Sequence, residues 1–248
     1  MCACNEFGTG KTQIDFDWRY AGNNPKNLSA ELPITNQGNC GSCWAFADAG
    51  IMEITNYLTN PHHGLVKFSE QQIVSCNPMR YGCNGGWDDY VLTQWMIPSK
   101  VKTVLLANYP YIAKRTRCEV KPTTLAYPTG LTYVYATDNP QLYIDALMGG
   151  PLNVWIRADT SVFQYYKTGI LNNSCCLNGQ LRLNHVVVLV GYSIDINGNS
   201  AWIIRNSWAG SWGRGGYGYI KITPQGDGIC GEQNTGYTIS VHQYTPTP

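Results

Sequence analysis

The chain has 248 residues, of which 44% are hydrophobic and 13% charged, so it can bury a core and lacks the composition of a disordered protein. Seventeen Lys and Arg residues oppose sixteen Asp and Glu residues, and the formal net charge is +1. This near-neutral balance excludes a broad electrostatic surface for nucleic acid or an anionic membrane. No apolar run approaches the roughly 20 residues that a membrane-spanning helix needs.

Helical patterns dominate the first half of the chain. Apolar residues recur at helical spacing over residues 43–58, which predicts a long amphipathic helix. Ser69 and Gln72 have the spacing of a capping box and predict a short helix through Val74. A third helix is expected over residues 87–96.

After residue 128 the pattern changes to short apolar runs separated by Gly and Asn turns. Strands are expected at residues 131–135, 152–156, 185–192, 201–205 and 217–222, with one helix over residues 139–147. We therefore predict an α+β fold with an N-terminal extension and crossing segment (residues 1–23), a mainly helical domain (24–129) and a mainly β domain (130–248). A cleft between two such halves is a common place for a ligand site.

Ten cysteines in a chain of this size indicate an oxidising compartment. The first residues, Met1–Asn5, have neither the positive charge nor the apolar stretch of a secretory signal peptide. If the protein is exported, we expect the chain to be a processed form.

Cys43 begins the strongest predicted helix, where the first turn presents unpaired N–H groups and the positive end of the helix dipole. Such a position lowers the pKa of a thiol from about 8.5 towards the roughly 3.5–7.5 range of activated cysteines. Cys40-x-x-Cys43 is also a redox or zinc spacing. However, no second pair completes a zinc set, and no preceding strand provides a βαβ redox context. We interpret Cys43 as a candidate nucleophile.

A cysteine nucleophile needs a base, and the chain has four histidines. Two lie in a polar turn at residues 62–63 and His242 lies near the C-terminus, whereas His185 leads an apolar strand. A histidine that leads a strand is, taken alone, more often structural. Asn206 ends the next predicted strand, and antiparallel pairing of the two strands would bring its amide to the imidazole.

These residues lie within longer motifs. Cys40-Gly41-Ser42-Cys43-Trp44 resembles the nucleophile motif of papain and cathepsin cysteine proteases, in which His and Asn follow roughly 130–150 residues downstream. Cys43 and His185 are 142 positions apart. The resemblance continues in Asp17-Trp18-Arg19, Cys83-Asn84-Gly85-Gly86, the run from Asn184 to Tyr192, and Asn206-Ser207-Trp208 with Trp212-Gly213. These blocks keep the family's order from about residue 15 to residue 240, and the chain is identified as a member of this papain-like family.

The resemblance implies a papain-like two-domain fold, with a helical left domain, a β-barrel-like right domain and the active-site cleft between them. It implies that Cys43 attacks the peptide carbonyl and that His185 acts as acid and base. Asn206 would orient the imidazole, Trp208 would shield that hydrogen bond from water, and Gln37 would hold the oxyanion together with the Cys43 N–H. No metal or cofactor is implied.

The resemblance also implies a set of disulfides. Reserving Cys43 leaves nine cysteines, an odd number. The implied bridges are Cys40–Cys83, Cys76–Cys118, and one from Cys230 to either Cys175 or Cys176. Nothing in the sequence decides between the last two. We choose Cys176–Cys230, which leaves Cys175 to pair with Cys2 or Cys4.

Substrate binding is assigned by the resemblance to Gly85, Gly86, Trp87, Asp88, Leu183, Asn184, Val186, Trp208 and Thr235. Of these, Trp87, Leu183 and Val186 predict an apolar pocket for an aliphatic side chain two residues before the scissile bond. Val186 stands where the family has a small residue and narrows this pocket. Asp88 at the rim would pair weakly with Arg or Lys, or it only caps the helix that starts there. Ala209 replaces a common family glycine, and we expect φ < 0 at that position.

We therefore expect a monomeric cysteine endopeptidase, lysosomal, vacuolar or secreted, that acts on peptide or protein substrates. A propeptide or protein inhibitor is a further expected partner, whereas nucleic acid and membrane are not. Two alternatives stay open: a non-catalytic binding or storage module with the same fold, and a transpeptidase in which an incoming amine outcompetes water at the thioester. A redox protein built on Cys40-x-x-Cys43 is a distant third.

Overall fold

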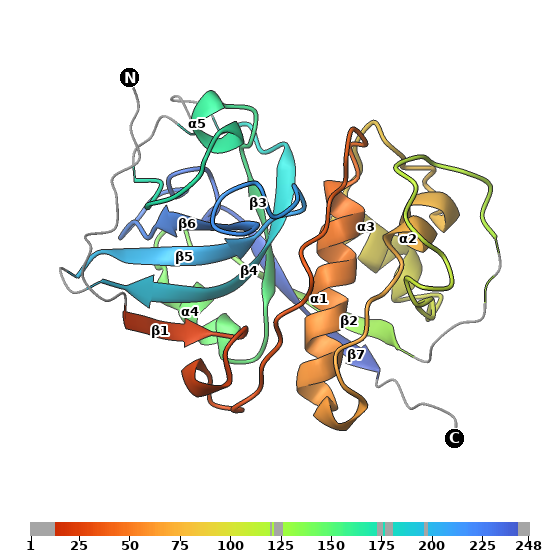
Figure 1. Ribbon diagram of the computed structural model, residues 1–248, viewed down its shortest axis with the longest axis horizontal. Coiled ribbons are helices and arrows are strands. Elements are labelled where there is room, and N and C mark those ends of the chain that lie inside the picture. Colours follow the sequence, from red (N-terminus) through yellow and green to blue (C-terminus); the bar gives the residue numbers. More distant parts are fainter. Residues whose placement is uncertain are drawn as a thin grey trace. The chain divides into compact units, whose positions relative to one another are not determined.

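The computed structural model describes residues 13–119, 121, 126–172, 176, 181–195 and 198–242, which form two compact units (Figure 1). The first, here called the sheet unit, comprises Met1–Thr35 and Tyr133–Tyr237. The second, the helical unit, comprises Asn36–Thr132 and Thr238–Pro248. Both units are discontinuous in sequence, whereas the predicted domains are continuous.

Residues 24–35 belong to the sheet unit, although the predicted helical domain begins at residue 24. The reason is local: the Ala30 N–H donates to the Trp18 carbonyl (2.8 Å), and the Ser29 hydroxyl donates to the Arg19 carbonyl. These hydrogen bonds fold the segment back onto the chain that precedes it.

The helical unit is built around α1 (Cys43–Thr59), the helix that the apolar spacing predicts. The apolar side chains of α1, among them Trp44 and Ile51, are buried along nearly its whole length. The other helical elements are η2 (Pro61–His63), α2 (Glu70–Cys76), α3 (Asp88–Val91) and the π-helical turn η3 (Leu92–Met96).

The capping box predicted for α2 is only half formed. The Ser69 hydroxyl accepts from the Gln72 N–H (3.0 Å), as expected for an N-cap. The Gln72 side chain does not return to Ser69, because it accepts from the Val104 N–H and donates to the Lys102 carbonyl. The Ser69 N–H instead donates to the Val104 carbonyl. A tertiary contact thus replaces the local one.

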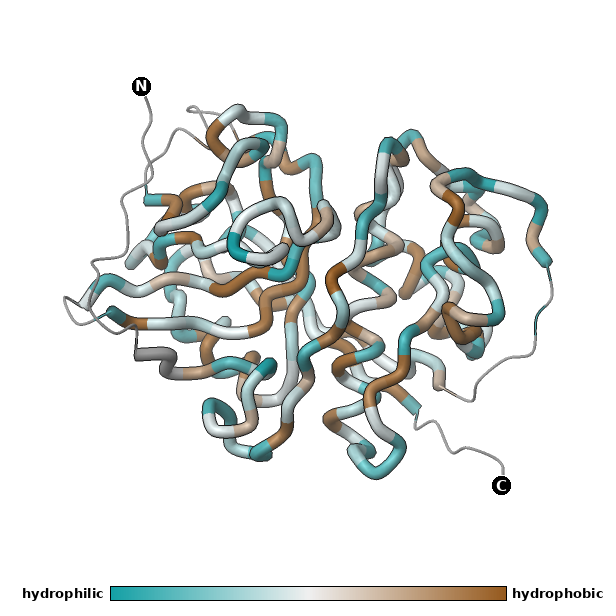
Figure 2. The backbone as a smooth tube through the Cα atoms, viewed as in Figure 1, coloured by the Kyte–Doolittle hydropathy of each residue, from teal (hydrophilic) through white to brown (hydrophobic). Residues whose placement is uncertain are grey.

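The sheet unit is built around β4 (His185–Ile194), which pairs antiparallel with β3 (Leu152–Ile156), β5 (Ser200–Arg205) and β1 (Gln13–Asp17). The remaining elements are η1 (Ala21–Asn23), α4 (Gln141–Leu147), α5 (Ser161–Gln164) and β6 (Tyr217–Lys221). The strand β7 (Gly236–His242) begins in the sheet unit, and its residues from Thr238 onward belong to the helical unit. β4 is buried at every position from His185 to Gly191, and its hydrophobic run is visible in Figure 2. A strand covered on both faces reads as a continuous rather than an alternating apolar run.

Gly191 allows β1 to approach β4. A Cβ atom at this position would lie 2.3 Å from the Phe16 carbonyl oxygen, so no larger residue fits without backbone movement. The register of β4 against β5 shifts between Leu189 and Gly191, and the Val190 carbonyl accepts from the Trp18 N–H instead.

The sheet is not closed. Its strand order is β2-β7-β3-β4-β5-β6, with β2 (Tyr127–Val134) and β6 at the two ends and β1 attached to β4. The α+β class is confirmed. The domain that was expected to resemble a β-barrel is an open antiparallel sheet, because the end strands β2 and β6 do not pair. Within the described ranges, no helix is both long and apolar enough to cross a bilayer.

Among the described residues, three disulfides join Cys40 to Cys83, Cys76 to Cys118, and Cys176 to Cys230. The first two are pairs that the resemblance implies, and the third is the one chosen above between Cys175 and Cys176. The first two lie in the helical unit and the third in the sheet unit. The pairing proposed for Cys175 with Cys2 or Cys4 falls outside the described residues.

Candidate active site

Cys43 is the first residue of α1, and its side chain is a partly exposed thiol. The first turn of α1 carries no acidic residue that would oppose the positive end of the helix dipole. The positive end of a helix dipole favours the thiolate form of a cysteine over the thiol. Because Cys40 is bonded to Cys83, a Cys40–Cys43 redox pair is excluded.

The loop that leads into α1 is held against residues 83–85. Beside the Cys40–Cys83 disulfide, the Gly41 N–H donates to the Cys83 carbonyl (2.8 Å), and the Gly85 N–H donates to the Gly41 carbonyl (3.2 Å). A Cβ at Gly41 would lie 2.6 Å from the Cys83 oxygen, so this close approach requires glycine. The position of Cys43 is therefore set by covalent and backbone contacts within a few residues.

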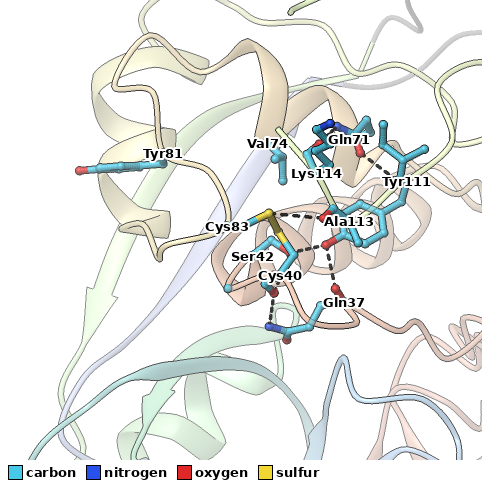
Figure 3. Close-up of a disulfide and its surroundings, with 12 residues drawn as sticks. Gln37, Cys40, Ser42, Gln71, Val74, Tyr81, Cys83, Tyr111, Ala113 and Lys114 are labelled. Atoms are coloured by element: carbon cyan, nitrogen blue, oxygen red, sulfur yellow. Dashed lines mark hydrogen bonds between the residues drawn. A yellow bond between two sulfur atoms is a disulfide. The ribbon is translucent and has the colours of Figure 1, made fainter. Parts of the chain in front are cut away.

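Gln37 lies in the same loop and is buried. Its Nε2 donates to the Cys40 carbonyl (2.9 Å), as Figure 3 shows, so the amide is oriented by the main chain of the loop. Gln37 and Cys43 thus both belong to the helical unit, Gln37 in the loop and Cys43 at the first position of the helix that follows it.

His185 begins β4 in the sheet unit, and Asn206 follows the end of β5. The antiparallel pairing of these strands brings the His185 Nε2 to 2.8 Å from the Asn206 Oδ1. This oxygen also accepts from the Ser207 N–H (2.8 Å), which identifies it as the acceptor end of the amide. The His185 Nε2 therefore carries a hydrogen, and in the neutral ring Nδ1 holds the lone pair.

Burial governs the electrostatics of His185. The ring is almost fully enclosed, and the loss of water lowers its pKa from 6.5 to about 4, while the hydrogen bond to Asn206 acts in the opposite direction. Without a neighbouring negative charge, the folded protein therefore keeps this imidazole neutral at pH 7.

Aromatic rings surround the imidazole. The Trp208 ring lies 4.9 Å from it at an interplanar angle of 34°, and Phe163 lies 6.4 Å away. Trp212 contacts Phe163, and its Nε1 donates to the Phe163 carbonyl (2.9 Å). Phe163 comes from the short helix α5, which the sequence did not predict, and no spacing motif marks it as part of this cluster.

The predicted substrate-binding residues fall into two groups. In the sheet unit, Val186 and Thr235 are largely buried, Leu183 is half-buried and Asn184 is exposed. The Asn184 Oδ1 accepts from the Ala158 N–H (2.8 Å), which fixes the side chain.

In the helical unit, Gly85 is exposed, Gly86 is half-buried and Trp87 is 58% exposed. Asp88 is completely buried at the first position of α3, so it does not lie at a solvent-reached rim as expected. Its carboxylate near the first turn fits the capping alternative.

In the sheet unit, Trp155 is a neighbour of Val186 and Thr235 that the sequence analysis missed. It lies directly opposite Val186 in the β3–β4 register, and its N–H donates to the Thr235 carbonyl (3.4 Å). Residues directly opposite in an antiparallel pair share a face of the sheet. Strand register was the missing signal, because Trp155 is distant from both partners in sequence.

The profile described as "Papain family cysteine protease" matches residues 13–239. The chain belongs to the papain family of cysteine proteases. It is 36% identical over 217 residues to ananain from Ananas comosus, covering 87% of this chain and 58% of that protein. The chain thus spans less than two thirds of the length of this relative.

Solved structures of the papain family share the fold. Bromelain from Ananas comosus in complex with the E64 inhibitor has a TM-score of 0.78 and 33% identity, with 91% of this chain and 97% of that chain covered. A ragweed pollen cysteine protease in its proform has a TM-score of 0.75 and 29% identity, with 97% of this chain and 62% of that chain covered.

Ala209, which replaces a common glycine of the papain family, does not have the negative φ expected from the sequence. Its φ is +62°, and its N–H donates to the Thr35 carbonyl (2.9 Å). This hydrogen bond holds the backbone in the left-handed region, which costs an L-residue roughly 1–2 kcal/mol.

Ala209→Gly should therefore raise the free energy of unfolding by about 0.5–1 kcal/mol, because the strain removed exceeds the entropy that glycine adds to the unfolded chain. Denaturant titration measures the change. Ala21→Gly, at an ordinary φ, is the control and should lower stability. A lower free energy of unfolding in Ala209→Gly would contradict backbone strain at Ala209.

Proposed function

We propose that the chain is a cysteine endopeptidase that hydrolyses peptide bonds through a thioester on Cys43. The observation that carries the proposal is the oriented imidazole: Asn206 fixes the hydrogen on the His185 Nε2, so that Nδ1 is the atom able to take a proton from a thiol. The helix position of Cys43 supplies the complementary preference for a thiolate.

In the proposed reaction, the Cys43 sulfur attacks the peptide carbonyl carbon, and the Cys43 N–H with the Gln37 amide stabilises the oxyanion. The C–N bond breaks as His185 gives its Nδ1 proton to the leaving amine. His185 then takes a proton from water as the water oxygen attacks the thioester carbon. The C–S bond breaks, the carboxylic acid product leaves, and the Cys43 thiolate is restored beside the protonated His185. Trp208 beside the ring limits access of bulk water to the His185–Asn206 hydrogen bond.

Partners and location are part of the same proposal. We infer peptide or protein substrates, a propeptide or protein inhibitor as a further partner, and a monomeric enzyme. The match to a relative solved in its proform supports the propeptide. The three disulfides support an oxidising location, lysosomal, vacuolar or secreted.

Cys43→Ala should leave less than about 1% of wild-type turnover, because it removes the nucleophile, while the unfolding midpoint stays unchanged since the thiol is partly exposed. His185→Ala should be comparably damaging, and Asn206→Ala should keep measurable activity because the amide only orients the ring. A fluorogenic dipeptidyl substrate provides the assay, and binding of E64 should disappear with Cys43. His62→Ala is the matched control. A loss there equal to that in His185→Ala would show that the wrong base was assigned.

The titration of His185 tests whether the thiolate and the imidazole interact. In Cys43→Ala, the pKa of His185 should stay near 4, because burial lowers it and the hydrogen bond to Asn206 offsets only part of that effect. In the wild type, a neighbouring thiolate should raise this pKa. NMR of the ring protons measures both, and equal values in the two proteins would contradict an ion pair.

The stability of the Cys43→Ala variant should depend on pH through His185. The pKa of His185 in the folded state, about 4, lies below the unfolded value of about 6.5. His185 therefore favours the folded state above about pH 6.5, and this contribution is lost as the pH falls towards 4. His185→Gln in the same background should remove that part of the pH dependence.

We further propose a preference for an aliphatic side chain two residues before the scissile bond. Val186 and Trp155 face the same side of the sheet, which supports the proposal. In the proposed pocket, Leu183 and Thr235 would form the remaining wall of the sheet unit. Two large side chains opposite each other leave a narrow pocket, which favours Leu or Val over Phe. The buried Asp88 offers no exposed charge for Arg.

A positional substrate library should show Leu or Val first in the wild type. Val186→Ala should raise the Phe-to-Leu ratio about tenfold, because each methylene accommodated contributes roughly 1 kcal/mol. Asp88→Asn is the control and should change the preference for Arg by less than about twofold. A wild-type preference for Phe, or for Arg over Leu, would overturn this pocket.

A further inference from the structure

We propose that Tyr111 is a positioning residue for the oxyanion site, because its hydroxyl group joins the backbone of Gln37 to the residue that precedes Cys43. The inference rests on the proposed function, since it assigns a purpose to Tyr111 through Gln37. Tyr111 lies 74 residues beyond Gln37 in sequence, and none of the motifs quoted above includes it.

The hydrogens on these groups can be counted. The Tyr111 hydroxyl lies 2.9 Å from the Gln37 carbonyl oxygen and 2.6 Å from the Ser42 Oγ (Figure 3). The Ser42 Oγ also lies 3.4 Å from the Cys40 carbonyl oxygen, a longer contact than the one to Tyr111. Because the Gln37 carbonyl only accepts, we assign the single phenol hydrogen to Gln37 and the Ser42 hydrogen to the shorter contact with Tyr111. The chain of donors therefore runs from Ser42 through Tyr111 to the main chain of Gln37.

The Gln37 side chain extends this chain, since its amide donates to the Cys40 carbonyl. Main chain and side chain of Gln37 are thus both held, the first by Tyr111 and the second by Cys40. Linked hydrogen bonds of this kind polarise and strengthen one another in a buried setting. Ser42 is fully buried and Gln37 nearly so.

The ring of Tyr111 is placed independently of its hydroxyl. It packs edge-on against Phe46, in the first turns of α1, with centroids 4.7 Å apart and an interplanar angle of 83°. The adjoining segment is held by Gln71, whose Oε1 accepts from the Ile112 N–H and whose Nε2 donates to the Lys114 carbonyl. These contacts therefore fix the position of the Tyr111 hydroxyl relative to α1.

Ser42 shows that this arrangement departs from local preference. A serine at the N-cap ordinarily accepts from an N–H of the first turn, which is worth about 1 kcal/mol. Ser42 is the N-cap of α1, yet its side chain makes no such hydrogen bond. Its hydroxyl binds Tyr111 instead. Such departures from local rules concentrate at functional sites.

The Tyr111 hydroxyl is protonated, as a hydrogen-bond donor must be. Burial raises the pKa of Tyr111 above its usual value of 10.0, with the hydrogen bond to Ser42 acting in the opposite direction. The hydroxyl therefore keeps its hydrogen and remains a donor at neutral pH.

Tyr111→Phe tests the inference, because it keeps the ring against Phe46 and removes only the hydroxyl oxygen. We expect kcat for a peptide substrate to fall about tenfold with KM changed by less than about twofold, since a loosely held oxyanion donor weakens the transition state and not substrate binding. Alkylation of Cys43 by iodoacetamide, a displacement that forms no oxyanion, should keep its rate within about twofold.

Tyr109→Phe is the matched control. Tyr109 is a buried tyrosine two residues earlier, and its hydroxyl donates to a different carbonyl, that of Arg117. Its variant should keep kcat and the alkylation rate within about twofold of wild type. Ser42→Ala offers a second probe, and it should lower kcat less than Tyr111→Phe because Tyr111 still donates to Gln37.

A double-mutant cycle separates this inference from the proposed function. In a Gln37→Ala background, Tyr111→Phe should lower kcat by less than about twofold, because its effect passes through Gln37. An unchanged kcat in Tyr111→Phe, a parallel fall in the alkylation rate, or full additivity with Gln37→Ala would each overturn the role of Tyr111. An active Cys43→Ala enzyme would instead overturn the proposed function itself.

Discussion

The attachment of the residue 37–42 loop to residues 83–85 is the constraint on which the helical unit's part of the site depends. A helix start can favour a thiolate only if its first turn stays in place and its N–H groups stay available. Here the Cys40–Cys83 disulfide and two backbone hydrogen bonds of Gly41 hold that start. The glycine is required because a side chain at residue 41 would collide with the opposing carbonyl. Rigidity is thus built from the backbone, and side chains such as Gln37 are oriented against it.

In the sheet unit, strand pairing fixes the backbone position of His185. β4 pairs with three strands and is buried over most of its length, so the backbone at its first residue is held in place. The β4–β5 pairing then places Asn206 beside the imidazole, and the Ser207 N–H decides which end of the amide faces it. A tautomer is therefore chosen by strand register and one backbone hydrogen bond.

The two titratable groups of the proposed reaction lie in contrasting environments. Burial among Trp208 and Phe163 makes the His185 imidazole prefer its neutral form. Cys43 lies at the start of α1, a kind of position that favours the charged form of a thiol. Under the proposed function, proton transfer between them would therefore be governed by their mutual electrostatic interaction as much as by either environment. We propose that the same aromatic enclosure also limits water around the His185–Asn206 hydrogen bond.

The sequence by itself determined the local elements: the helix that begins at Cys43, the N-cap at Ser69, the strand over residues 152–156 and the start of a strand at His185. Each follows from periodicity or capping over a few neighbouring residues. The motifs of the sequence also indicated the papain family and the candidate residues that lie within those motifs.

Tertiary structure alone decided the features that depend on distant partners. The sequence did not predict β1 and β7, because a short strand is defined by the strand with which it pairs. The burial of Asp88, the positive φ of Ala209, the position of Trp155 opposite Val186 and the hydroxyl contacts of Tyr111 belong to the same class. Periodicity states which face of an element is apolar, but side-chain partners across dozens of residues are set only when the chain packs.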